Sequence, residues 1–362
     1  MAARSYRASS RSPVCVRDAI ERLHDAVSLD AFSPLSGAAA LVVDLDDTAG
    51  LEAVASSTVA SAAARLGELP CVTVGLRSEA SDVSAESTST QSAASFAKTI
   101  EQRLDVIVTA AAQRDRLLDA VAAHPIAATA LVQLLRHGER LDLHEALIAE
   151  SLAYSTLQSG PEFAAWLGDQ PRASDKRDGS SEPAVLVSRN GSRLDLVLNR
   201  PQRHNAYSAA MRDALVAGLE IAAADASISE VVLGGNGPSF SAGGDLAEFG
   251  TLPDPATAHV VRSTRNAARL LARLAGRVRA EVHGACIGAG VELAAFAKRV
   301  VARPDAFFEL PEVAMGLVPG AGGTASIPRR IGRQRTAYLA LTGERIDART
   351  AHEWGLVDEI VA

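Results

Sequence analysis

Apolar positions in the second half of the chain form short β-type runs that alternate with longer stretches of helical spacing. Two such runs flank Asn190-Gly191, a dipeptide that favours a two-residue turn, and predict a β-hairpin over residues 184–201. Ser208 suits the N-cap of the helix that follows. The further elements expected in this half are helices over 206–225 and 257–276, strands over 229–237 and 279–286, and two strands within 298–310. This alternation predicts an α/β fold with crossover connections and buried parallel strands.

The first half repeats the pattern with fewer glycine-rich turns. We expect strands over 37–47 and 70–76, a helix over 51–69 between them, a helix running into a strand over 96–112, and helices throughout 124–167. The polar segment 168–184 is rich in Gly, Pro and Ser and predicts an exposed linker. The expected organisation is therefore a domain of residues 1–167, a linker of residues 168–184 and a domain of residues 185–362.

Composition narrows the class of protein. Of 362 residues, 48% are apolar and 22% are charged, which suits a globular protein of two domains or one large one. The net charge of −7, without a basic run, gives no reason to expect nucleic-acid binding. Charges interrupt every apolar stretch before about 18 residues, so no membrane span is expected. The basic start lacks the apolar core of a secretory signal and fits a frayed tail or a transit peptide. The scattered Cys15, Cys71 and Cys286 fit a reducing cytosol and show no metal-ligand spacing.

Three segments concentrate glycine where a strand meets a helix, namely 238–249, 283–294 and 310–332. Such turns let main-chain N–H groups face a ligand, and two converging donors can hold a developing oxyanion; tight packing is the alternative. Glu292 and Glu312 each follow such a turn in apolar surroundings, where a raised pKa suits general acid or base work. Stabilisation by a helix dipole is the alternative for each acid, but the pair favours a site.

Five motifs follow one another over residues 185–362, about half of the chain. They are NRPQRHNAYS (199–208), FSAGGDL (240–246), HGACIGAGVELA (283–294), LPEVAMGLVPGAGGT (310–324) and LTGERIDARTAHEWGLVDEIV (341–361). In sequence and order they resemble the motifs of the crotonase superfamily, the enoyl-CoA hydratase/isomerase family. The resemblance implies a crotonase-like core, a superhelix of β-β-α units.

The resemblance also implies roles for single residues. The backbone N–H groups of Ala242 and Ala289 would form the oxyanion hole for a thioester carbonyl, with Ala289 standing where the family usually has glycine. Glu292 and Glu312 match the two glutamates that bracket a water in hydratases, one acting on the water and the other supplying the α-proton. Asp245 is implied in binding the substrate, and the alternative is that its side chain only stabilises the turn in which it lies.

The implied contacts to coenzyme A come from Arg203, Ala206, Gly243, Asp245, Leu246 and Arg136. Arg136 falls where the family often has a lysine near the CoA phosphates, and a solvated helix face is the alternative. Further cationic candidates are Arg329, Arg330 and Arg333.

The helical stretch 124–167 resembles the helices that family members usually carry after the last motif, whereas this sequence stops at Ala362. The first half thus resembles a degenerate crotonase copy. We expect two crotonase-like halves of which only the second, without its usual C-terminal helices, is catalytic. The helices of the first half could cover the catalytic site within the chain or across a subunit interface.

The resemblance implies hydration of a 2-enoyl-CoA, without a tightly bound cofactor and with coenzyme A as part of the substrate. The cysteine pattern leads us to expect a cytoplasmic protein. Isomerisation or hydrolysis of an acyl-CoA is one alternative, and a non-catalytic acyl-CoA-binding or scaffold subunit is another. By analogy with the family we expect a homo-oligomer, a trimer or a hexamer, and neither a nucleic-acid nor a membrane partner.

Overall fold

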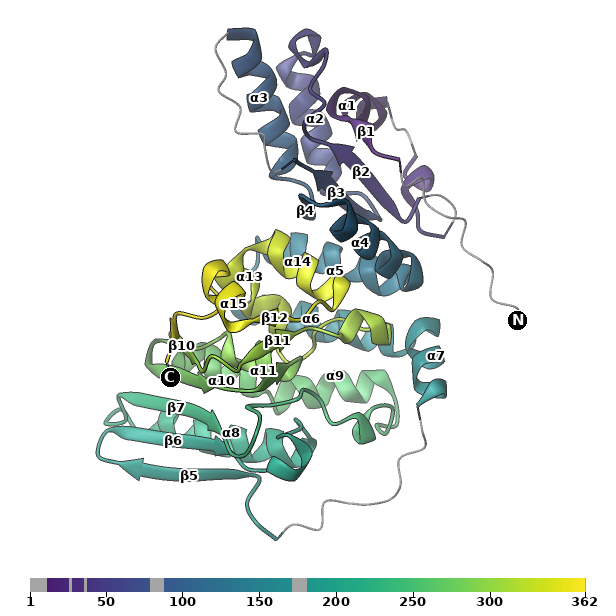
Figure 1. The fold of residues 1–362 in the computed structure, drawn as a ribbon. Helices are drawn as coiled ribbons and strands as arrows, with labels where there is room; N and C mark the ends of the chain where they lie inside the picture. Colours follow the sequence, from purple (N-terminus) through teal and green to yellow (C-terminus); the bar gives the residue numbers. More distant parts are fainter. Residues whose placement is uncertain (1–11, 26–27, 36–37, 79–87, 171–180, 362) are drawn as a thin grey trace. The chain divides into compact units, whose positions relative to one another are not determined.

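The computed structural model describes residues 12–25, 28–35, 38–78, 88–170 and 181–361 (Figure 1). The chain divides into two compact units: residues 1–136 with 333–342, and residues 137–332 with 343–362. The division falls within helix α5 (Pro125–Gly138) and not at the expected linker, most of which lies outside the described residues. Helices α6 (Leu143–Gln158) and α7 (Pro161–Asp169), which we had expected in the first domain, belong to the second unit.

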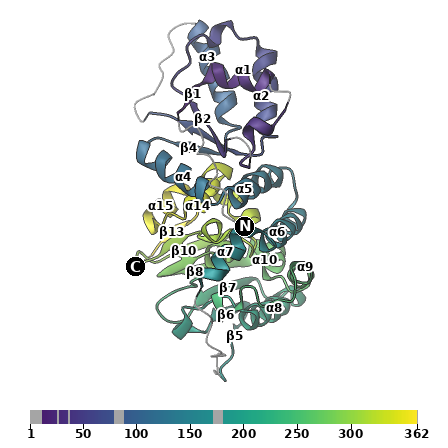
Figure 2. The same cartoon turned by 90° about the vertical axis from the view of Figure 1, so that its right-hand side faces the viewer.

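The first unit contains a four-stranded parallel sheet in the order β1-β2-β3-β4. Its strands are β1 (Val14–Cys15), β2 (Ala40–Asp44), β3 (Val72–Leu76) and β4 (Val106–Val108). Its helices are α1 (Val16–Asp25), α2 (Ser56–Leu66), α3 (Thr88–Glu101), α4 (Ala111–Ala123), most of α5, and α14 (Arg333–Thr342). The expected strands 37–47 and 70–76 are confirmed, whereas β1 and α1 were not predicted. Helices α1, α2 and α3 pack in sequence over a core that includes Ile20 and Leu66 (Figure 2).

Among the described residues, no single helix is long and apolar enough to cross a membrane. Helices α4 and α5 pass that test of length and composition only as a pair, which is bent by 109°.

The second unit contains a six-stranded sheet in the order β13-β10-β8-β7-β6-β5 and a three-stranded sheet in the order β12-β11-β9. The hairpin is confirmed, but Asn190 pairs with Arg193, so its two loop residues are one position later than predicted. The strands are β5 (Val185–Asn190), β6 (Arg193–Leu198), β7 (Glu230–Gly235), β8 (Val278–Val282), β9 (Ala285–Ile287), β10 (Arg299–Ala302), β11 (Phe307–Glu309), β12 (Ile346–Asp347) and β13 (Glu359–Ile360).

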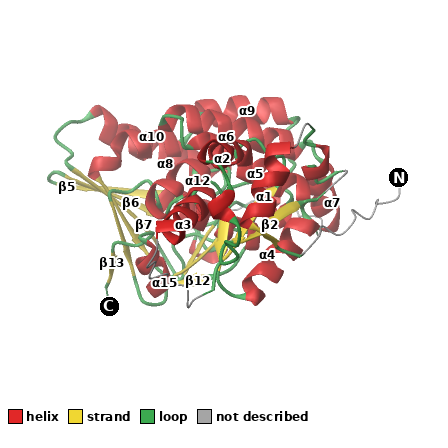
Figure 3. Cartoon of the chain, turned by 90° about the horizontal axis from the view of Figure 1, so that it is seen from above, coloured by secondary structure: helices red, strands yellow, loops and turns green. Residues whose placement is uncertain are grey.

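Helix α8 (Ala209–Ala224) packs on the hairpin strands and beside α10 (Ala267–Leu274) (Figure 3). The Ser208 hydroxyl accepts a hydrogen bond from the Met211 N–H, which confirms the expected N-cap. The helix expected over 257–276 is broken, because the Asn266 side chain caps a new helix at α10 after α9 (Pro255–Thr264) ends. The remaining helices are α11 (Ala289–Ala294), α12 (Gly323–Ser326), α13 (Pro328–Ile331) and α15 (Ala348–Trp354).

The strand expected over 279–286 is also divided, into β8 and β9, which belong to different sheets. Gly284 lies between them with a φ of +53°, a conformation that favours glycine. A Cβ atom there would also approach the Pro238 carbonyl oxygen to 2.1 Å. The division turns the chain towards the glycine-rich segments that surround the site.

Candidate active site

A cavity of about 410 Å³ lies within the second unit. Helices α6, α7 and α9 line it, together with the turn after β7 and the starts of α11 and of the loop that leads to α12. Of the predicted site residues, Glu292, Glu312, Ala289 and Asp245 line this cavity. The helices that cover the site therefore come from the same chain and the same unit as the two glutamates.

Two of the glycine-rich segments run side by side at this cavity. Ser241 forms a β-bridge with Cys286, and the N–H of Ile287 donates to the Ser241 carbonyl at 2.9 Å. A Cβ atom on Gly243 would meet the Ile287 carbonyl oxygen at 3.0 Å. The close approach of the two main chains brings residues 242–244 beside the start of α11.

Ala289 is the first residue of α11, and Gly244 lines the cavity with it. Among the described residues, neither N–H group has a hydrogen-bond acceptor. The assignment of Ala242 to an oxyanion hole is wrong, because its N–H donates to the His204 carbonyl at 2.9 Å and Ala242 does not line the cavity. Gly244, two residues further along, presents the free donor instead.

The carboxyl group of Glu292 is held by the loop that precedes α12. The side chain is 2% exposed, and its Oε2 accepts hydrogen bonds from the N–H groups of Ala321 at 2.7 Å and Gly323 at 2.8 Å. Burial raises the pKa of Glu292 to about 7, against these two donors, which favour the charged form. A Cβ atom on Gly323 would lie 2.6 Å from Cγ of Glu292, so glycine is required for this approach.

Glu312 begins a 3₁₀ turn (Glu312–Met315), and its carboxyl group differs from that of Glu292 in its hydrogen bonds. Its Oε2 is buried and has no hydrogen-bond partner among the described residues. Burial, reinforced by the negative charge of Glu292, raises the pKa of Glu312 well above its ordinary value. Oε1 lies where a Cβ atom on Gly288 would approach it to 2.4 Å. The site therefore pairs a carboxyl that accepts two main-chain hydrogen bonds with one whose buried Oε2 has none and which favours the protonated form.

A third carboxyl, from Glu150 on α6, was not predicted as a site residue. It is 2% exposed; Oε1 accepts from the Gly322 N–H at 2.7 Å, and Oε2 accepts from the Thr324 N–H at 2.9 Å and its hydroxyl at 2.7 Å. Burial and the charge of Glu292 raise its pKa to about 8. Glu292 and Glu150 thus bind alternate N–H groups of one loop. The acid in ALIAES, which follows four apolar residues, was the available signal for this residue.

We expect Glu150→Gln to lower kcat by about 10-fold or more, because an amide retains the volume but turns a donor towards a loop N–H or hydroxyl that needs an acceptor. The loop would then position Glu292 less well. Steady-state kinetics on a substrate of the protein, with Glu145→Gln on the exposed face of the same helix as the control, test this role. Equal kcat values for the two variants would show that Glu150 does not position the loop.

The turn after β7 contains the other residues implied in binding coenzyme A. Asp245 accepts a hydrogen bond from the Ala247 N–H at 3.1 Å and forms an ion pair with Arg203 at 2.9 Å. These contacts fit the alternative role of Asp245, in which it stabilises the turn. Ala206, Gly243 and Leu246 belong to the adjoining segments but do not line the cavity, and contact between them and coenzyme A stays a prediction.

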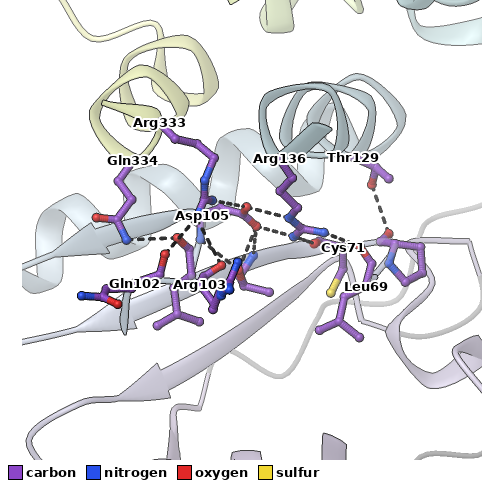
Figure 4. A network of polar contacts seen from close by, with 12 residues as sticks. Leu69, Cys71, Gln102, Arg103, Asp105, Thr129, Arg136, Arg333 and Gln334 are labelled. Carbon is purple, nitrogen blue, oxygen red and sulfur yellow. Dashed lines mark hydrogen bonds and ion pairs between the residues drawn. The ribbon is translucent and has the colours of Figure 1, made fainter. Parts of the chain in front are cut away.

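The assignment of Arg136 to the CoA phosphates is wrong. Its guanidinium is buried in the first unit, where it forms an ion pair with Asp105 at 2.5 Å and donates to the carbonyls of Leu69 at 2.6 Å and Cys71 at 2.9 Å (Figure 4). Arg333 is also excluded as a ligand of the CoA phosphates, because its buried guanidinium forms an ion pair with the same Asp105 at 3.0 Å. The remaining two candidates bind main-chain carbonyls within the second unit: Arg329 those of Ala325 and Leu141, and Arg330 those of Leu356 and Ala297.

Comparison with known proteins identifies the family of this chain. The family described as enoyl-CoA hydratase/isomerase matches residues 189–362. The 2,3-dehydroadipyl-CoA hydratase of Escherichia coli is 41% identical over 179 residues, which cover 49% of this chain and 68% of that protein. The 1,2-epoxyphenylacetyl-CoA isomerase of the same organism is 36% identical over 173 residues, 46% of this chain and 66% of that protein.

Among solved structures, the enoyl-CoA hydratase of Mycobacterium smegmatis is 36% identical, with a TM-score of 0.46 over 50% of this chain and 71% of that one. The family match covers the segments that supply Glu292, Glu312, Gly244 and Ala289. The chain belongs to the enoyl-CoA hydratase/isomerase family of the crotonase superfamily.

Proposed function

We propose that the protein adds water across the 2,3 double bond of an enoyl-CoA thioester. The observation that carries this proposal is the contrast between two buried carboxyls in one cavity. Glu292 accepts two main-chain hydrogen bonds, whereas Oε2 of Glu312 has no partner among the described residues. Hydration needs one base and one acid, and such a contrast in environment separates the two roles.

In the proposed reaction, the N–H groups of Gly244 and Ala289 donate to the thioester oxygen as it gains negative charge. Ionised Glu292 takes a proton from water while the water oxygen bonds to C3. Protonated Glu312 gives its proton to C2, which becomes a CH₂ group. One C–O bond and one C–H bond form, and a proton returns from Glu292 to Glu312 before the next turnover. Coenzyme A enters as part of the substrate, and the reaction uses no metal or redox group.

Loss of the absorbance of the conjugated enoyl thioester tests this function. We expect the purified protein to consume at least one 2-enoyl-CoA in a series of increasing acyl length, and the product to be the 3-hydroxyacyl-CoA. If no member of the series loses absorbance in the presence of the protein, the proposal is wrong.

Double-bond isomerisation is the second candidate, because one relative, from Mycosarcoma maydis, is named as an enoyl-CoA isomerase/hydratase. It requires a proton to leave one carbon and return to another, and Glu312 alone could carry it. An isomerase would convert a 3-enoyl-CoA in the Glu292→Gln variant, whereas hydration would stop.

The pH dependence of kcat/KM should follow from the two carboxyls. The base must be ionised, and burial raises the pKa of Glu292 to about 7, so activity should rise with pH through about that value. The acid must be protonated, so activity should fall again at higher pH as Glu312 titrates from its raised pKa. Because the two carboxyls interact, each apparent pKa of this bell-shaped profile describes the pair and not one residue. A kcat/KM that declines steadily from about pH 5 would contradict these roles.

We also propose that the first unit is a second, divergent crotonase-like half. What supports this is the strand order: β1-β2-β3-β4 in the first unit and β6-β7-β8-β10 in the second are both adjacent, parallel and in chain order. Helices connect the strands in both units. The segments of the first unit contain no counterpart of Glu292 or Glu312, so catalysis falls to the second unit.

A further inference from the structure

Arg262, on α9, lines the same cavity and is held by a row of polar side chains on α6. Its Nε donates to the Ser151 hydroxyl at 3.0 Å, Nη2 donates to the Ser155 hydroxyl at 2.5 Å, and Nη1 lies 3.4 Å from Oε1 of Gln158. Residues 151, 155 and 158 share one face of the helix, so this row is built into α6. The guanidinium is thereby fixed in place at the cavity.

All of these partners are uncharged. The guanidinium also lies over the ring of Tyr154, 4.8 Å from its centroid, and burial lowers the pKa of Arg262 from its ordinary value. No carboxylate of the described residues lies within ion-pair distance, and the nearby Glu150 uses both of its oxygens on the loop before α12. A guanidinium stays protonated, so a partly buried positive charge remains without a counterion.

Arg212 also lines the cavity, but it has a counterion, because it forms an ion pair with Asp213 at 2.9 Å. Arg262 has five N–H donors in a planar fork, and one hydrogen on Nη1 is not used by the protein. The cavity thus offers an oriented, uncompensated donor to an anion.

The position of Arg262 assigns it to the acyl end of a substrate. Tyr154 lies between Arg262 and the catalytic loop, because a Cβ atom on Gly320 would come within 2.3 Å of the tyrosine ring. The next residue, Ala321, donates to Glu292. The segments expected to contact coenzyme A, at residues 203–208 and 243–246, belong to other elements. The cation therefore lies with the loop that faces the double bond.

We propose that Arg262 binds a carboxylate at the far end of the acyl chain, so that the preferred substrates are 2-enoyl-CoA thioesters of dicarboxylic acids. This inference rests on the proposed function and names its substrate class. A charge-assisted hydrogen bond to a guanidinium in a cavity would favour such substrates over uncharged ones of equal length by about 10- to 100-fold in kcat/KM.

The test compares 2-hexenoyl-CoA with the six-carbon 2-enoyl-CoA that ends in a carboxylate. Wild-type protein should prefer the second, and Arg262→Met should abolish the preference through a lower kcat/KM for the carboxylated substrate. Arg262→Lys should retain part of it, and Arg265→Met, at the exposed end of the same helix, should retain all of it. A wild type without the preference, or an Arg262→Met variant that loses both activities equally, would overturn the proposal.

Binding separates this inference from the proposed function. Hexanoyl-CoA and adipyl-CoA, the saturated counterparts, can be titrated into wild type and variants by calorimetry without turnover. Tighter binding of adipyl-CoA that requires Arg262 supports the proposal even if hydration is not found. Equal affinities would overturn it even if hydration is found, and would leave the proposed hydration standing.

Discussion

Glu292→Gln is expected to lower kcat for hydration of a 2-enoyl-CoA by about 10²- to 10⁴-fold, because the water would lose its general base. The amide has nearly the same shape, and its oxygen can still accept from the N–H groups of Ala321 and Gly323. The loop and the cavity should therefore persist. Glu312→Gln should cause a loss of similar size for a different reason, because the proton for C2 would have no donor.

The matched measurements are steady-state kinetics and the dissociation constant for a saturated acyl-CoA. Both variants should bind the saturated thioester within about 3-fold of wild type, since the proposed oxyanion donors are main-chain groups of Gly244 and Ala289. If either variant retained more than about a tenth of the wild-type kcat, the corresponding carboxyl would have no general acid–base role.

Asp105→Ala is expected to destabilise the first unit by about 3–5 kcal/mol, because it removes the carboxylate that two buried arginines share. Asp105 is 1% exposed and accepts from Arg136 at 2.8 Å, from Arg333 at 3.0 Å and from the Thr73 N–H at 2.9 Å. Figure 4 shows the arginines and the carboxylate in one network. Urea unfolding, followed by a probe in the first unit, measures the change in the free energy of unfolding.

Asp115→Ala provides the control, because Asp115 forms an ion pair with Arg114 while its side chain is 49% exposed. An exposed pair contributes about 0–1 kcal/mol, so this variant should unfold almost as wild type does. Replacing Asp105, Arg136 and Arg333 together with apolar residues of similar volume should recover much of the lost stability. A loss below about 1 kcal/mol for Asp105→Ala would show that the other partners of the two arginines satisfy them without this carboxylate.

The sequence allowed the two glutamates and the turns around them to be predicted, because their requirements are local. Glu292 needs glycine at Gly323 for close approach, and Gly288 adopts a positive φ beside Glu312. Such constraints appear as fixed spacings within short motifs. The secondary structure of the second unit followed for the same reason, except where a capping residue such as Asn266 divided a helical pattern.

What could not be predicted depended on distant partners. Arg136 has a cation's usual position on a helix, and it is internal because of partners far away in the sequence: Asp105, 31 residues earlier, and the carbonyls of Leu69 and Cys71. Glu150 acts on a loop 172 residues later. The error at Ala242 arose because the turn around His204 uses its N–H group, and no spacing within FSAGGDL indicates which donor remains free.

The most direct measurement of the proposed activity is turnover of a 2-enoyl-CoA in water enriched in heavy oxygen, with the product analysed by mass spectrometry. We predict a 3-hydroxyacyl-CoA that carries one heavy oxygen atom at C3 in wild type, and at least about 100-fold less of it in Glu292→Gln over the same time. A wild-type product of unchanged mass, or free coenzyme A with the label in the released acid, would contradict hydration and indicate isomerisation or hydrolysis instead.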